Sequence, residues 1–244
     1  MKAAPYGWRA KIGLIYIASA YAMEVEFNQM APPGVTTHTT RIALCEQPDQ
    51  FTVSDLSTLG KDALAATKLL AQAPLTSIAF GCTSGSFVNG FEYDKAFIKR
   101  MEAVANIPCT TTANAAVEAL QSLKIKKVAI ATPYEKDVNE LAYQYFTDGN
   151  LQITNMTGLG IANDYQISKL DTNSIYQMAM NVNTEDAEAV FLSCTGLSAA
   201  NIIHVLEEDL QKPVITSNQA TFWYALKLSN VNAKIKNYGE LFER

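Results

Sequence analysis

The chain has 244 residues, of which 48% are hydrophobic and 18% are charged. These proportions support a substantial hydrophobic core and do not fit a disordered chain, a collagen-like repeat or a coiled coil. The formal net charge of −5 argues against a nucleic-acid partner, because binding to a phosphate backbone needs a clustered basic surface.

The sequence contains no candidate membrane-spanning segment and no candidate metal site. The first apolar run, residues 12–23, is interrupted by polar residues and is shorter than the roughly 20 residues of a membrane-spanning helix. Four cysteines without a C-x-x-C pair, together with two histidines, fit neither a secreted disulfide framework nor a zinc site. No G-x-G-x-x-G motif follows a strand. We therefore expect a cytoplasmic protein with no cofactor, no metal, and no membrane or nucleic-acid partner.

Short apolar runs alternate along the chain with longer segments of helical periodicity. The predicted strands are, in chain order, 12–17, 77–80, 107–111, 127–131, 153–156, 189–192 and 214–215. The predicted helices are 53–73, 97–104, 113–123, 135–146, 174–181, 199–210 and 219–228. This alternation is typical of parallel sheets covered by helices, and hence of the α/β class.

The first long helix shows the clearest periodicity. Ser54 is its expected N-cap. Its apolar stripe, one residue every three or four, consists of Leu56, Leu59, Ala63, Ala66 and Leu70.

The two halves of the chain resemble each other. Lys11 begins one apolar strand and Lys127 another, 116 residues later. Cys82 and Cys194 each follow a later strand and precede a threonine, 112 residues apart. Each half then reaches a short strand led by proline. The repeat predicts two similar Rossmann-like or flavodoxin-like subdomains related by a pseudo-twofold axis, with the two thiols facing each other across the cleft between them.

The expected subdomain boundaries follow from this repeat. The first subdomain comprises residues 1–115 together with 219–244, and the second comprises residues 116–218. The last helix is expected to pack back onto the first subdomain. We also expect a homo-oligomer, either a dimer or a tetramer.

Two opposed thiols suit proton transfer at carbon. One thiolate removes a proton or adds to a double bond, and the other thiol delivers a proton from the opposite face. A helix that begins at either cysteine would lower the pKa of its thiol, so we expect at least one low-pKa thiol that alkylates quickly near neutral pH. A free cysteine is also a common core residue, but two at matching positions favour function. The expected donors to a substrate carboxylate are Thr83, Ser84, Thr195 and Gly196.

These segments resemble a known superfamily. Gly-Cys-Thr-Ser around Cys82, Ser-Cys-Thr-Gly-Leu around Cys194, Ala-Thr-Pro-Tyr ending at Tyr134, and Thr-Ser-Asn-Gln-Ala around Asn218 are similar to motifs of the aspartate/glutamate racemase superfamily. Within it, nearly the whole chain resembles maleate cis-trans isomerases and arylmalonate decarboxylases.

The resemblance implies roles for individual residues. Cys82 matches the isomerase cysteine that attacks the double bond, where decarboxylases have glycine. Cys194 matches the proton donor that both branches share. Tyr134 matches a tyrosine that binds a substrate carboxylate, and Asn163 falls near an asparagine that helps to hold maleate. For both residues a purely structural role is the alternative: Tyr134 as a turn aromatic beside Pro133, and Asn163 as an ordinary turn residue.

One loop departs from the isomerase pattern. Ala20 stands where isomerases carry an asparagine that contacts the substrate, and Ser19 before it remains a candidate substrate-binding residue. The loss of this amide puts maleate itself in doubt. A monocarboxylate, or a diacid with a bulkier substituent, becomes the more plausible substrate.

Three functions are therefore open. The leading hypothesis is a cofactor-independent isomerase or racemase of a small carboxylic acid, with Cys82 as nucleophile or base and Cys194 as the opposed acid. The second is an arylmalonate-type decarboxylase in which Cys194 alone protonates the intermediate. The third is a non-catalytic ligand-binding protein that keeps the cleft. We expect structural positions for the remaining candidates, namely His38, His204, Cys45 and Cys109.

Overall fold

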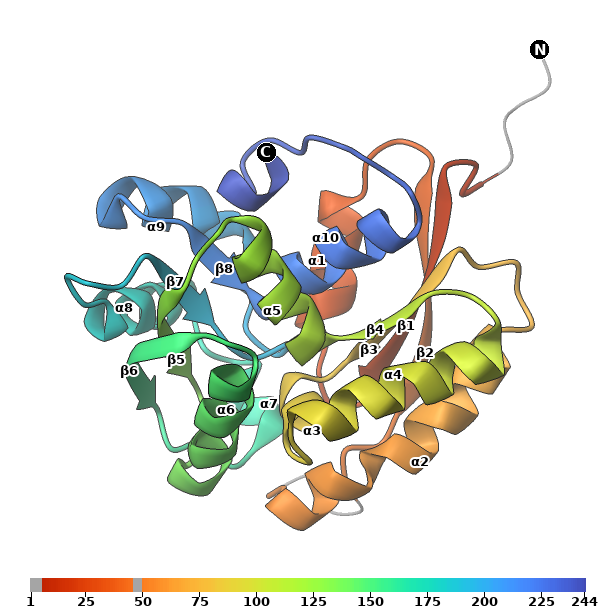
Figure 1. The fold of residues 1–244 in the computed structure, drawn as a ribbon, viewed down its shortest axis with the longest axis horizontal. Helices are drawn as coiled ribbons and strands as arrows, with labels where there is room; N and C mark the ends of the chain where they lie inside the picture. Colours follow the sequence, from red (N-terminus) through yellow and green to blue (C-terminus); the bar gives the residue numbers. More distant parts are fainter. Residues whose placement is uncertain (1–5, 46–49) are drawn as a thin grey trace.

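Two four-stranded parallel sheets form the core of the protein (Figure 1). The computed structural model describes residues 6–45 and 50–244. The strand order of the first sheet is β2-β1-β3-β4. Its strands are β1 (Ala10–Ile17), β2 (Val35–Ile42), β3 (Ser77–Gly81) and β4 (Cys109–Thr111).

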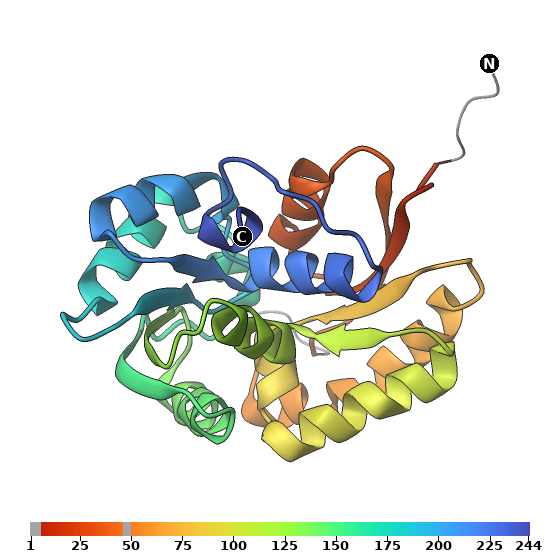
Figure 2. The same ribbon diagram turned by 45° about the horizontal axis from the view of Figure 1, so that its top comes forward.

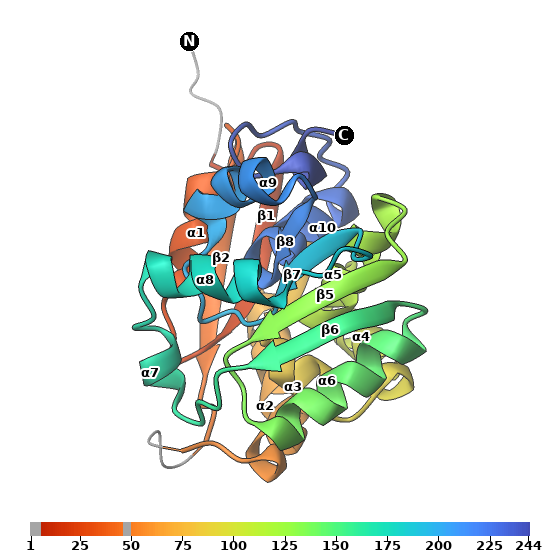
Figure 3. The same cartoon turned by 90° about the vertical axis from the view of Figure 1, so that its left-hand side faces the viewer.

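The second sheet repeats the first. Its order is β6-β5-β7-β8, and all of its strand pairs are parallel (Figure 3). Its strands are β5 (Lys127–Thr132), β6 (Gln152–Gly158), β7 (Ala189–Leu192) and β8 (Val214–Thr216). The predicted α/β class with two similar units is confirmed.

Equivalent hydrogen bonds make the repeat visible at the level of single residues. The Thr76 backbone N–H donates to the Lys11 carbonyl oxygen at 2.8 Å, and the Glu188 N–H donates to the Lys127 carbonyl oxygen at 2.8 Å. Each bond joins the first strand of a half to the residue that leads into the strand before a cysteine. The two cysteines therefore occupy equivalent places because the strands that carry them are equivalent.

Helices cover the sheets on both faces (Figures 1 and 3). They are α1 (Ala22–Met30), α2 (Val53–Leu70), α3 (Thr83–Phe87), α4 (Phe91–Ala105), α5 (Thr112–Ser122), α6 (Lys136–Asp148), α7 (Asp164–Ile167), α8 (Thr172–Val182), α9 (Ile203–Leu210) and α10 (Ser217–Leu228). Single 3₁₀ turns span Ala200–Ile202 and Glu240–Phe242. No helix in the described ranges is long and apolar enough to cross a membrane.

The expected cap of α2 is wrong. Thr52, two residues earlier than Ser54, is the N-cap, and its hydroxyl oxygen accepts the Asp55 N–H at 3.2 Å. The Asp55 carboxylate accepts the Thr52 N–H in return at 2.8 Å. This reciprocal box satisfies two backbone donors that the helix itself leaves free. The predicted apolar stripe of α2 is fully buried, as expected.

Helices α5 and α10 lie side by side between the two halves (Figure 2). Each begins directly after the last strand of its sheet and is capped by that strand's final threonine: Thr111 accepts from the Asn114 N–H, and Thr216 from the Gln219 N–H. Helix α10 contacts β3 and β4 of the first sheet. This agrees with the expected return of the last helix, whereas the exact division into subdomains stays a prediction.

Two local expectations need correction. Helix α4 begins at Phe91, six residues before the predicted start at residue 97. A short helix follows Cys82, but none begins at Cys194, where a turn at residues 195–196 leads into an irregular segment. Helices α1 and α7 were not predicted, because both are short.

Candidate active site

Cys82 follows β3 directly and is the N-cap of α3. Its backbone is extended, with φ of −147° and ψ of 111°, and its sulfur accepts the Gly85 N–H at 3.3 Å. The Ser84 hydroxyl lies 3.8 Å from the same sulfur. The thiol is 4% exposed. Two donors therefore face Cys82, and both stabilise a thiolate more than a thiol.

Cys194 lies two residues after β7, the strand of the second sheet that is equivalent to β3. The Gly196 N–H donates to its sulfur at 3.3 Å. A methyl group at Gly196 would meet Ile167 at 3.2 Å and the Ser168 hydroxyl at 3.4 Å, so the turn packs closely against α7. This close packing explains why glycine follows the Cys194-Thr195 pair.

Tyr134 connects the two cysteines. It follows β5, is 2% exposed, and packs against the Phe87 ring of α3. Its hydroxyl is hydrogen-bonded to Cys194, is within hydrogen-bonding reach of Thr83, and is close enough to Cys82 for the charge of that thiolate to raise the pKa of the phenol. Both predicted catalytic cysteines and the predicted tyrosine are thus brought together.

The expected low-pKa thiol is not found. Burial raises the pKa of Cys82 to about 11 and that of Cys194 to about 12. The Asp164 charge raises both values further. Opposing this, the Gly85 N–H lowers the pKa of Cys82, and the Tyr134 hydroxyl lowers that of Cys194. Desolvation outweighs these donors, because a buried thiolate loses its hydration.

The predicted donors surround the thiols in different ways. Thr83, Ser84 and Thr195 are buried. The Thr83 hydroxyl donates to Ser217 on α10 at 2.9 Å. The Thr195 carbonyl accepts from the Tyr16 hydroxyl at 3.0 Å, which fixes the loop after Cys194.

Asn163 is the N-cap of α7. Its side-chain oxygen caps α7 by accepting the Gln166 N–H at 2.9 Å. The next residue, Asp164, is buried and lies close enough to raise the pKa of both cysteines. The predicted residue Ser19 donates to the Asp164 carboxylate at 2.6 Å. The loop offers two neighbouring polar residues, and its sequence does not specify which of them faces the thiols, so the substrate contact expected of Asn163 stays a prediction.

A second buried carboxyl holds the Cys194 loop. Glu26 of α1 accepts the Asn218 side-chain amide at 2.6 Å and the Ala200 N–H at 2.8 Å. Asn218 also donates to the carbonyls of Thr195 and Leu197, each at 3.3 Å. Burial raises the pKa of Glu26 to about 7. No sequence pattern indicated this role, since a lone glutamate on a short helix usually faces water.

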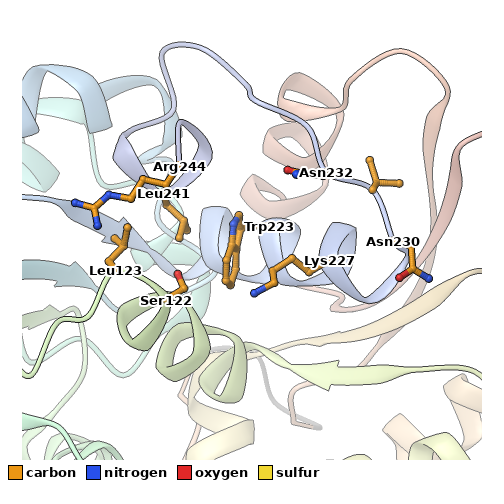
Figure 4. Close-up of a pocket in the computed structure, with 9 residues that line it drawn as sticks. Ser122, Leu123, Trp223, Lys227, Asn230, Asn232, Leu241 and Arg244 are labelled. Atoms are coloured by element: carbon orange, nitrogen blue, oxygen red, sulfur yellow. The ribbon is translucent and has the colours of Figure 1, made fainter.

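Neither cysteine lines the pocket of about 510 Å³ that lies over α5 and α10. That pocket is lined in part by Ser122, Trp223, Lys227 and Arg244 (Figure 4). In the described part of the chain, no group of three or more histidine, cysteine or acidic side chains is arranged to hold a metal ion. His204 is exposed and Cys109 buried in β4, consistent with the structural positions expected for them.

The fold and the site define a class: a two-sheet parallel α/β protein whose paired cysteines end equivalent strands. A family model described as arylmalonate decarboxylase matches residues 13–242, and the chain belongs to this family. The predicted family resemblance is confirmed.

Two relatives with different activities, a decarboxylase and an isomerase, are similar to this chain. Arylmalonate decarboxylase of Bordetella bronchiseptica is 32% identical over 164 residues, covering 66% of this chain and 68% of the relative. Maleate isomerase of Pseudomonas putida is 24% identical over 244 residues, covering 95% and 96%.

Solved structures agree with the fold along nearly the whole chain. A maleate isomerase variant from Pseudomonas putida, crystallised with maleate, has a TM-score of 0.90 at 22% identity and covers 96% of this chain and 97% of its own. A double mutant of arylmalonate decarboxylase in its liganded form has a TM-score of 0.88 at 26% identity, covering 96% and 99%.

Proposed function

We propose that this protein is an isomerase of a small carboxylic acid that uses Cys82 and Cys194 as an opposed pair. The observation that carries the proposal is that Cys82 and Cys194 follow equivalent strands and that both lie close to the Tyr134 hydroxyl. Maleate isomerases among the relatives support the same reaction class. A Nocardia farcinica maleate cis-trans isomerase mutant, similar in fold, is described with a covalently bound succinylcysteine intermediate.

The two thiols take different roles because they are coupled. A charge on Cys82 raises the pKa of Cys194, so the pair holds one proton more readily than none. Cys82 faces the Gly85 N–H and Ser84, which favour the thiolate. Cys194 is the proton carrier, with the Tyr134 hydroxyl donating to its sulfur. In this assignment Cys82 is the nucleophile and Cys194 the acid.

The reaction steps balance, because every bond formed with the enzyme is broken again and every proton given is returned. The Cys82 thiol, whose pKa burial raises to about 11, first loses its proton to solvent; the thiolate then adds to one carbon of the double bond, and the π electrons move toward the carboxylate. Cys194 gives its proton to the other carbon, which leaves a single bond that can rotate. The Cys194 thiolate takes a proton back, the C–S bond breaks, and the trans isomer leaves. Racemisation uses the same groups, with one thiolate as base and the other thiol as acid.

Charge that develops on the substrate carboxylate needs fixed donors. The Ser84 hydroxyl and the Thr195 backbone N–H are assigned this role, because the hydroxyl protons of Thr83 and Tyr134 are already donated to Ser217 and Cys194. Such donors lower the barrier because they are already oriented before the charge develops. Ser19, at the other side of the cleft, acts through Asp164.

The test is cysteine replacement. We expect Cys82→Ala and Cys194→Ala to lower the turnover of a cis-unsaturated carboxylate by at least about 10³-fold, since each removes a group that reacts. Cys109→Ala is the matched control, because Cys109 is also buried but lies in β4. Full isomerase activity without Cys82 would overturn the proposal. Solvent deuterium appearing at carbon, in a screen of small mono- and dicarboxylates, would identify the substrate class.

A decarboxylase is the second candidate, favoured by the 32% identity to arylmalonate decarboxylase. In that reaction Cys194 protonates a planar enediolate after CO₂ has left, and Cys82 has no chemical step. CO₂ release from a disubstituted malonate that is lost with Cys194→Ala but kept with Cys82→Ala would select it.

A further inference from the structure

Helix α7 belongs to the second half of the chain but is anchored to the first. Ser19 donates to Asp164 at 2.6 Å, and the Tyr21 hydroxyl donates to the Ser168 carbonyl at 2.7 Å. Both anchors come from the loop between β1 and α1. They tie α7 to the first half, with Asp164 close enough to both thiols to raise the pKa of each.

Helix α7 and its C-terminal end carry two polar side chains that have no role in the proposed reaction. Asp164 and Ser168 are one helical turn apart, and both are buried. The Ser168 hydroxyl has no hydrogen-bond partner among residues 6–45 and 50–244. A methyl group at Gly196 would lie 3.4 Å from this hydroxyl and 3.6 Å from the Cys194 sulfur, so the hydroxyl is on the Cys194 side.

Asp164 also lacks a cation. No lysine, arginine or histidine in the described ranges forms an ion pair with it. Arg41 of β2 donates to the carbonyls of Ala18 and Ala20 in the adjoining loop and pairs with Glu24. The Asp164 carboxylate therefore meets an incoming substrate with one hydrogen bond from Ser19 and no compensating charge.

We propose that Asp164 and Ser168 select a substrate that carries one carboxylate and, at its other end, a hydrogen-bond donor such as an amide or a hydroxyl. The inference rests on the proposed isomerase and names its substrate class. A second carboxylate at this position would face Asp164 directly, and two carboxylates without a cation repel each other unless one takes up a proton. A donor group instead satisfies Asp164, while Ser168 donates to its oxygen. Specificity of this kind depends on the repulsion as much as on the new bond.

The experiment compares maleamate, the monoamide of maleate, with maleate itself. We expect the wild-type protein to favour maleamate in kcat/KM by at least about 10-fold, and Asp164→Asn to shift that ratio toward maleate by at least about 10-fold, because an amide donates to a carboxylate. Asp62→Asn, at an exposed position of α2, is the matched control and should leave the ratio unchanged. Ser168→Ala should lower kcat/KM for maleamate more than for maleate.

A binding readout separates the two proposals. Protection of Cys82 from alkylation gives the affinity of each compound without turnover, with thermal melting to verify that each variant is folded. Wild-type protein that turns over neither compound counts against the proposed isomerase, whereas the order of the two affinities still tests the inference. Equal affinity for both compounds, or an order that Asp164→Asn and Ser168→Ala both leave unchanged, would overturn the inference.

Discussion

At the scale of single residues, Tyr134 influences how readily Cys194 ionises. Its hydroxyl is hydrogen-bonded to Cys194, which lowers the pKa of that thiol, while the charge of either thiolate raises the pKa of the phenol. The phenol therefore stays protonated and donates. Removing it leaves the Cys194 thiolate, formed in the second half of the reaction, with the Gly196 N–H as its remaining donor.

Tyr134→Phe tests this arrangement. We expect kcat to fall by about 10²-fold, since one oriented donor to a developing charge is lost, while the folded state persists because the ring still packs on Phe87. Steady-state kinetics with thermal melting as the folding control provides the measurement. An unchanged kcat would contradict the role assigned to the hydroxyl.

Residue-level prediction succeeded where two copies of a pattern reinforced each other. Cys82 and Cys194 were found because each ends an apolar strand before a threonine. Asp164 was missed, since it occurs once, in a loop whose neighbour Asn163 is equally polar. Burial of its carboxylate depends on Ser19, which is 145 residues away in the chain, and no local pattern reports such a contact.

At the scale of elements, capping explains how both halves begin their central helices. Thr216 accepts the Gln219 N–H at 3.1 Å, and the Gln219 side chain accepts the Thr216 N–H at 3.2 Å. This box starts α10 directly at the end of β8. It thereby sets the place of Ser217, whose hydroxyl accepts from Thr83 in the site.

Thr216→Ala removes this cap. We expect a loss of about 1 kcal/mol in the free energy of unfolding, typical of an N-cap threonine replaced by alanine. Thr39→Ala, at an exposed position of β2, is the control and should stay within about 0.5 kcal/mol. Urea denaturation measures both, and equal effects of the two substitutions would show that the capping box contributes little.

Elements with a clear apolar run or helical stripe were predicted well, and the shortest helices were not. The stripe of α2 and the apolar runs of β5 and β7 carry enough residues to reveal their period. Helix α7 has four residues and α3 has five, so neither completes two turns. Their positions depend on contacts across the cleft, which is why the helix expected at Cys194 is a turn instead.

At the scale of the whole molecule, a buried carboxyl joins the two halves near the site. Asp94 of α4 accepts the Tyr145 hydroxyl of α6 at 2.7 Å and the Thr111 hydroxyl at 2.7 Å. Its other oxygen is buried without a partner in the described part of the chain. Burial raises the pKa of Asp94 from 3.8 to about 7, so the neutral acid is the form that suits this environment.

This shift makes the stability of the protein depend on pH. Because the pKa is raised in the folded state, the contribution of Asp94 is fully present below about pH 4 and is lost as the pH rises through 7. Between pH 5 and 7.5 we expect it to remove about 3 kcal/mol of unfolding free energy. Asp94→Asn should flatten this part of the profile, whereas Asp62→Asn should not. Parallel profiles for wild type and Asp94→Asn would refute the assignment.

The repeat was the strongest whole-molecule signal in the sequence. It predicted two equivalent sheets and two equivalent thiols. It did not predict the asymmetry between the halves: a helix after Cys82, a turn after Cys194, and α7 across the cleft. These differences give two equivalent cysteines unequal surroundings, and hence the unequal roles proposed for them.

The most direct test of these roles is to trap the intermediate. In a Cys194→Ser variant, the Cys82 thiolate still adds to the substrate and the other carbon takes its proton slowly from solvent, but release slows further because no Cys194 thiolate takes that proton back. Mass spectrometry after incubation with a cis-unsaturated carboxylate that the wild type isomerises should detect one substrate mass on the peptide that contains Cys82. An adduct elsewhere, or no adduct on Cys82 while the wild-type protein isomerises the same compound, would contradict the account.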